Sequence, residues 1–122
     1  MLDPTATRFP HSRLDAYRIS LELASAARRM SDAIPHGYRT LADQLLRAGI
    51  AVPLLISEGA NRVTPGQKRQ RFSEARGECG ECAAAAEVAA VLGLVSPAEA
   101  QTVMVLADRV AAMLTRLVQR LS

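Results

Sequence analysis

The sequence has few aromatic residues, with only two tyrosines and two phenylalanines among 122 residues. Its core must therefore be filled by aliphatic side chains, and 49% of the residues are hydrophobic, many of them alanine. Small side chains allow neighbouring helices to pack closely. The four rings are scattered along the chain, so the sequence shows no aromatic surface on which single-stranded bases would stack.

Long apolar runs and a cysteine framework are also absent. The uncharged run from Ala48 to Ser57 has about half of the ~20 residues that a membrane span needs. The N-terminus has no apolar run typical of a signal peptide. Two cysteines do not make the dense pattern of a secreted disulfide scaffold. We therefore expect a cytoplasmic protein that does not enter the membrane.

No segment shows the alternation of apolar and polar residues that is typical of a strand. We expect residues 1–12 to form a disordered or extended leader. Residues 13–122 are expected to form one all-α domain, an antiparallel up-down-up-down four-helix bundle. The expected helices run from near Ser12 to Ala33, from between Tyr38 and Leu41 to Asn61, from Pro65 to Leu92, and from Pro97 to the C-terminus. In the first helix, the apolar face is expected to contain Leu14, Tyr17, Leu21 and Ala24.

Two segments carry the same signal for a helix start. Thr64-Pro65-Gly66-Gln67 and Ser96-Pro97-Ala98-Glu99 both place a capping residue before a proline in the first turn. In each segment the residue three positions after the cap is able to complete a capping box. Gly93 is expected to end the third helix.

Pro53 lies inside the second expected helix. Proline there removes one hydrogen bond and meets the carbonyl of the residue four positions back. That residue is Gly49, which has no side chain to resist bending. We predict a continuous helix with a bend between Gly49 and Pro53.

The fourth expected helix is apolar over a wider surface than one bundle face requires. Its main stripe consists of Val103, Leu106, Val110, Leu114, Leu117 and Leu121. Further apolar residues beside the stripe are Met104, Val105, Ala112 and Met113. A surface of this width indicates contact with a second protein surface, and we therefore predict self-assembly.

Three motifs give the chain a family resemblance. They are Gln44-Leu-Leu-Arg47-Ala48, then Glu58-Gly59, then Phe72-Ser-Glu-Ala75-Arg76-Gly77-Glu78 followed by Glu81. With them, the sequence resembles the small bacterial four-helix-bundle proteins first described as encoded in intervening sequences of large-subunit ribosomal RNA genes. It departs from that family at Ala51 and Leu55, where the family usually has serine and asparagine.

The resemblance implies a non-enzymatic bundle that assembles as a ring-shaped homo-oligomer, with a homopentamer favoured. It also implies similarity to accessory proteins of diversity-generating retroelements, which bind nucleic acid and a reverse transcriptase. Neither the ring size nor membership of that branch follows from the residues themselves.

Five polar residues on the second and third helices are candidates for one network. They are Gln44, Arg47, Glu58, Glu78 and Glu81. In an antiparallel hairpin of these helices, facing residues have numbers that sum to about 127, so Arg47 faces Glu81, with Glu78 as the second choice. Arg47 and Glu58 flank an uncharged run, which predicts that both are partly buried. The group could be a catalytic or ligand-binding cluster, but we favour ion pairs that fix helix register and expect no catalytic residue.

Cys79-Gly-Glu-Cys82 could be a redox pair or half of a zinc site. However, His11 and His36 lie at opposite ends of the first helix, roughly 30 Å apart. A di-iron site in a bundle would use Glu-x-x-His motifs, and no histidine follows His36. We therefore interpret the cysteines as small core residues and predict neither a metal nor a cofactor.

Positive charge gathers around the turn between the second and third helices. The cations are Arg62, Lys68, Arg69, Arg71 and Arg76. By the same rule for the numbers of facing residues, Glu58 lies opposite Arg69, with Arg71 close by. Cations at a helix N-terminus oppose its macrodipole, so either nearby acids or an external phosphate is expected to compensate them. Solvated surface residues would show the same pattern.

These patterns favour two functions. The first is a homo-oligomeric scaffold that binds RNA or DNA through phosphates with a strong salt dependence, which the net charge of +3 permits. The second is a protein-protein interaction module without nucleic-acid binding. An enzyme is the least supported class, because the sequence shows no nucleophile-base pair, phosphate loop or metal constellation.

Overall fold

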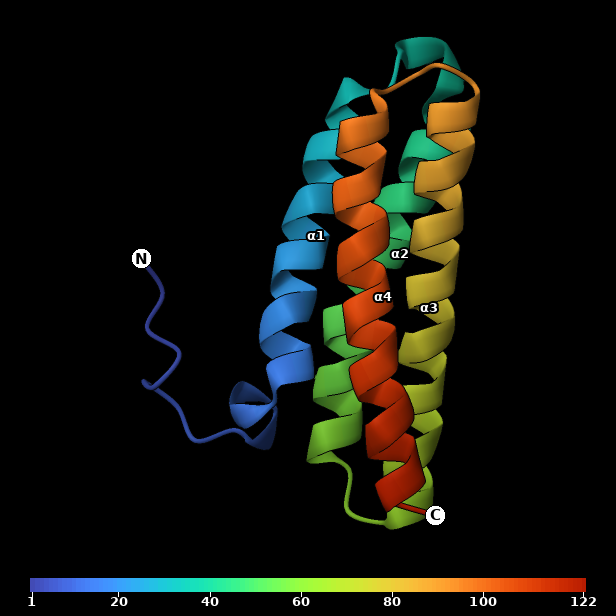
Figure 1. Cartoon of the computed structure of the whole chain (residues 1–122). Coiled ribbons are helices and arrows are strands. Elements are labelled where there is room, and N and C mark those ends of the chain that lie inside the picture. Colours follow the sequence, from blue (N-terminus) through green and yellow to red (C-terminus); the bar gives the residue numbers. More distant parts are fainter.

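The structure is a computed structural model that describes all 122 residues. It contains four α-helices: α1 (Asp15–Ala33), α2 (Arg39–Asn61), α3 (Pro65–Val91) and α4 (Pro97–Arg120). Short 3-10 turns at Pro10–Arg13 and His36–Tyr38 precede α1 and α2. There is no strand, so the all-α class is confirmed, and the helices pack as a four-helix bundle (Figure 1).

Consecutive helices are antiparallel neighbours, as short connections require. α2 packs against α1 and α3, and α4 packs against α3 and α1, which closes the bundle. The start of α1, the turn between α2 and α3, and the C-terminus therefore lie at one end (Figure 1). The other two connections lie at the opposite end.

Both expected capping residues begin a helix, but only one of them forms a complete capping box. The Thr64 side chain accepts a hydrogen bond from the backbone N–H of Gln67, and no reverse bond from the Gln67 side chain completes a capping box. Ser96 and Glu99 form the complete box. Gly93 follows α3 with a φ of +73°, the left-handed conformation in which glycine ends many helices.

The core consists of aliphatic and small side chains from all four helices. Eleven of the 23 buried hydrophobic residues are alanine, and Phe72 is the only buried aromatic residue. Leu23, Leu45, Ile56 and Leu114 are the largest side chains with no exposed surface. Each such side chain contributes about 1.5–3 kcal/mol by leaving water, and the alanines between them keep the helices close together.

The buried face of α1 is not the expected one. Leu21 was placed on that face, but it is 46% exposed, and Tyr17 is only partly buried. The core contains Leu23, Ala27 and Met30 instead. α1 has apolar residues on more than one side, so helical spacing alone fits two faces. Contact with α2 and α4 decides which of them is buried.

Gly49 lies where α1 and α2 approach closely. A Cβ atom at this position would be 2.6 Å from the Cβ of Ala27, which is well inside van der Waals contact. Pro53 is buried within α2, and the helix is continuous through it, as predicted. The bend stays a prediction, whereas the need for glycine at position 49 comes from the neighbouring helix.

The segment His36–Asn61 is long and apolar enough to cross a membrane by length and composition alone. Core helices of bundles meet the same criterion, because they too are rich in apolar residues. In this fold Leu45, Val52 and Ile56 are fully buried, and α2 is packed between α1 and α3. Packing inside the bundle therefore accounts for part of the apolar character of α2, since 33% of its apolar window is buried.

The N-terminal segment reaches the bundle through His11. Residues 1–9 contain no helix or strand, and the following 3-10 turn packs against α2. The side-chain amide of Asn61 donates to Nδ1 of His11 over 2.9 Å, and the His11 ring contacts the rings of Phe9 and Tyr17. The expected boundary at residue 12 thus falls inside the turn Pro10–Arg13.

Candidate nucleic-acid interface

The five cations predicted around the α2–α3 turn lie at one end of the bundle. Arg62 follows the last residue of α2, and the other four belong to the first half of α3. Arg62 is exposed and takes part in none of the six ion pairs of the chain. The other four have partners within the chain.

Lys68 and Arg69 bind the C-terminal ends of two other helices. Lys68 Nζ donates to the carbonyl of Ala60 in the last turn of α2 over 2.9 Å. Arg69 Nη1 donates to the carbonyl of Leu121, just after α4, over 2.6 Å. The last carbonyls of a helix have no donor within the helix and carry partial negative charge. These two cations therefore stabilise helix ends.

Arg71 is held between two carboxylates. Its Nε lies 3.2 Å from Glu58, and its Nη1 lies 2.8 Å from Glu74. The sequence placed Glu58 opposite Arg69 with Arg71 close by, and the partner is Arg71 rather than Arg69. Residues two positions apart on a helix point in directions that differ by about 200°. Arg71 therefore faces α2, whereas Arg69 faces the end of α4.

Arg76 also has a partner inside the chain. Its Nε donates to the Thr115 hydroxyl of α4 over 2.7 Å. A hydrogen bond to a neutral hydroxyl leaves the charge of the arginine uncompensated. Arg76 and Arg62 are therefore the predicted cations with the most positive charge left for a ligand.

Charge is distributed unequally between the two ends of the bundle. When each helix is divided near its midpoint, residues 1–23, 51–77 and 109–122 form one half, which we call the basic end. It contains eleven of the fifteen cations and five of the twelve acids, a net charge of +6. The other half has a net charge of −3. Antiparallel helices largely cancel one another's dipoles, so this polarity comes from the side chains.

Several cations of the basic end are outside the predicted set. They are Arg8, Arg13, Arg18, Arg109, Arg116 and Arg120. The spacings of seven and four residues between Arg109, Arg116 and Arg120 place them on one face of α4, and this signal is visible in the sequence. Only the fold brings Arg13 beside that face.

Arg47 joins α2 to α3 through two carboxylates. Its Nη1 lies 2.9 Å from Glu78, and its Nη2 lies 3.0 Å from Glu81, so both candidate partners bind it. The Arg47 side chain is 52% exposed, against 17% for Glu78, and Arg47 is therefore at the outer edge of the helix pair rather than buried. Exposed pairs of this kind contribute little to stability because water and salt screen them. Gln44 is exposed and Glu58 belongs to the separate Arg71 pair, so the predicted network is divided.

The pKa values of the two carboxyl groups beside Arg47 are shifted in opposite directions. Partial burial raises the pKa of Glu78, against the effect of its hydrogen bond with Arg47. Hydrogen bonds with Glu78 and Arg47 lower the pKa of Glu81. The hydrogen bonds of Arg47 with Glu78 and Glu81 raise the pKa of Arg47. The lowered pKa adds stability that is lost as the pH falls, whereas the raised pKa subtracts stability as Glu78 ionises. The two effects on stability oppose one another.

Cys79 and Cys82 are free thiols in the core. Burial raises the pKa of both to about 12. The thiolate rather than the thiol is the nucleophile and the metal ligand, so this environment favours the interpretation as core residues. No group of three histidine, cysteine or acidic side chains is arranged to hold a metal ion.

The fold and its charges define a class: an alanine-rich, antiparallel four-helix bundle with one basic end. The family described as 23S rRNA-intervening sequence protein matches residues 12–116, which include α1, α2, α3 and most of α4. The chain belongs to this family, and the resemblance carried by the sequence motifs is confirmed. No curated protein matches the chain.

Proposed function

We propose that this protein is a non-enzymatic, cytoplasmic, homo-oligomeric scaffold that binds RNA or DNA through phosphates at its basic end. The observation that supports this proposal is the charge separation of +6 against −3 along the bundle. Such a separation attracts a polyanion to one end and repels it from the other. A closed homo-oligomer would repeat the basic end once per subunit and strengthen its field.

The mode of binding follows from the side chains at this end. Of the three aromatic rings at this end, Phe72 is buried, Tyr17 is partly buried, and Phe9 is exposed but stacks on His11. The basic end therefore has no row of free rings on which successive bases would stack. The available groups are guanidinium and ammonium groups, which contact phosphates without reading the base sequence. We therefore expect little sequence preference and a strong dependence on salt.

Fluorescence anisotropy with a labelled RNA hairpin and a labelled DNA duplex tests this function. Titrations at about 50 mM and about 200 mM salt are expected to show binding that weakens at least about tenfold at the higher concentration, because several counterions are released. Absence of binding to both probes at the lower salt concentration would exclude nucleic acid. It would leave the protein-protein interaction module as the alternative.

Self-assembly is supported by apolar side chains that no helix of the chain covers. Ile50 and Leu54 are 45% and 59% exposed and lie one turn apart on the outer side of α2. Because Gly49 faces Ala27 in this antiparallel pair, Leu21 of α1 lies at the level of Leu54. We call Leu21, Ile50 and Leu54 the outer apolar patch. Burial against a second copy would remove this patch from water.

α4 offers less apolar surface than its sequence predicts. Val105 is exposed, but Met104 and Met113 are half-buried and pack against the core. Part of the wide apolar face of α4 is thus used within the chain. We therefore place the self-assembly surface on the outer apolar patch.

Native mass spectrometry of the purified protein measures the number of subunits. We expect a homo-oligomer, and a pentamer from the family resemblance. Leu54→Glu should shift the mass toward monomers, since it places a charge in the patch. Val91→Glu changes an exposed valine at the other end of the bundle and should leave the mass unchanged. A monomer of the unchanged protein at micromolar concentration would contradict self-assembly.

A further inference from the structure

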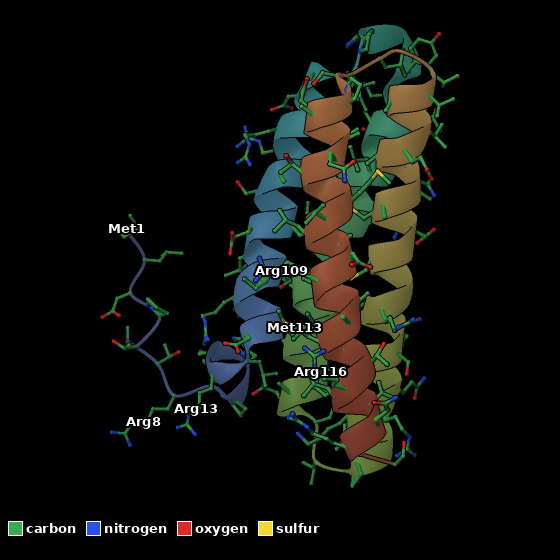
Figure 2. All side chains as sticks on the ribbon, in the orientation of Figure 1. Met1, Arg8, Arg13, Arg109, Met113 and Arg116 are labelled. Atoms are coloured by element: carbon green, nitrogen blue, oxygen red, sulfur yellow. The ribbon has the colours of Figure 1, made fainter.

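A cleft between the start of α1 and the last turns of α4 is bordered by three arginines. It holds about 260 Å³, and its lining includes Arg13, Arg116, Arg120, Leu14, Ala16, Met113 and Leu117. Figure 2 shows Arg13 near the first turn of α1, and Met113 and Arg116 on the lower half of α4. We call these seven residues the arginine cleft.

The three arginines have no partner within the chain. None of them takes part in an ion pair. The one acid that lines the cleft, Asp15, is already bonded to Arg18. The three arginines are exposed and border one cleft, so their like charges repel each other across it. A bound anion would relieve it.

We propose that the arginine cleft binds a phosphate group of a nucleic-acid backbone. Guanidinium groups match the oxygens of a phosphate in paired hydrogen bonds, and the cleft is open at the surface, so a polymer has access to it. This inference rests on the proposed function and assigns the site for it. The ligand is the phosphate backbone, without contacts to bases.

The α2–α3 turn is less suited to this role than its sequence indicates. Lys68 and Arg69 donate to carbonyls at helix ends, and two carboxylates compensate the charge of Arg71. The three arginines of the arginine cleft make no such internal contacts. Binding should therefore depend more on the cleft than on the turn.

Arg109 extends the positive surface along α4. It lies two turns before Arg116 on the same face of the helix, above Met113 in Figure 2. The row from Arg109 to Arg120 is roughly 16 Å long. One strand of a duplex carries a phosphate per about 3.4 Å of helix axis, so the row is long enough to face several phosphates of one strand.

Two charge-matched triple variants test the site. R13Q/R116Q/R120Q removes the three arginines of the cleft, and R28Q/R29Q/R39Q removes three exposed arginines from the other half of the bundle. In the anisotropy titration we expect the cleft variant to lose at least about tenfold in affinity and its salt slope to fall by about 2 to 3. The second variant should remain within about twofold of the unchanged protein.

A single substitution gives an independent measurement. Met113→Glu keeps every arginine but places a carboxylate among them, and it should also weaken RNA binding. Thermal unfolding followed by circular dichroism tests whether each variant is folded. If R13Q/R116Q/R120Q does not fold, the RNA affinity of Met113→Glu decides whether the arginine cleft is the binding site.

The outcomes separate this inference from the proposed function. If the unchanged protein binds RNA or DNA and the cleft variants bind equally well, the cleft assignment is overturned while the function stands. If the unchanged protein binds neither nucleic acid, both fail. Binding of inorganic polyphosphate without binding of RNA or DNA would overturn the assignment to a nucleic-acid backbone.

Discussion

Gly49→Ala is expected to destabilise the bundle by about 1–2 kcal/mol. In a helix interior the same change normally stabilises by about 0.5–1 kcal/mol, because glycine loses more backbone freedom on folding. Here the new Cβ would be 2.6 Å from the Cβ of Ala27, an atom fixed to the backbone of α1. Forcing such overpacking costs typically about 1–3 kcal/mol, which exceeds the gain. Urea unfolding followed by circular dichroism measures the difference.

Gly80→Ala is the matched control. Gly80 also lies in a helix, but no atom is within 4 Å of an added Cβ, so we expect a gain of about 0.5–1 kcal/mol. Adding Ala27→Gly to Gly49→Ala should recover part of the loss, since it removes the colliding methyl group. Equal effects of the two glycine substitutions would show that α1 and α2 do not approach as described.

Alkaline pH is expected to destabilise the protein through Cys79 and Cys82. Burial raises their pKa in the folded state from 9.0 to about 12. The contribution of each thiol to stability is therefore complete below about pH 9 and is lost as the pH rises toward 12. In this range the free energy of unfolding should fall by up to about 1.4 kcal/mol per pH unit for each thiol.

The double variant Cys79→Ala/Cys82→Ala should unfold with a much flatter pH dependence. Urea unfolding of both proteins between about pH 8 and about pH 11 gives the two slopes. The variant loses about 1 kcal/mol per site at pH 8 because small cavities remain, but the difference should shrink or reverse as the pH rises. Parallel curves for the two proteins would rule out the proposed contribution of the thiols.

The positions of the helices were predictable because their signals are local. Thr64 and Ser96 begin α3 and α4 as expected, and Gly93 ends α3 in the left-handed conformation. These signals act through hydrogen bonds and backbone angles within a few residues. The rule that facing residues of the α2–α3 hairpin have numbers that sum to about 127 also placed Arg47 opposite the correct turn of α3.

The side of a helix that meets each neighbour was less predictable. The sequence placed Glu58 opposite Arg69, with Arg71 close by. The height along the helix pair was right, but the partner is Arg71. On α1, Leu21 fitted an apolar spacing and yet is half-exposed. A helical period gives the angle between two residues of one helix, whereas the neighbour that each side meets depends on the packing of all four helices.

The sequence by itself determined the helical class, the ends of the helices, the small aliphatic core and the family. These properties depend on residues near one another in the chain and on composition. Only the tertiary structure decided that Gly49 meets Ala27, that most cations of the α2–α3 turn are engaged within the chain, and that Arg13 joins Arg116. The reason is that these contacts join different helices, and local periodicity contains no information about how far apart or how rotated those helices are.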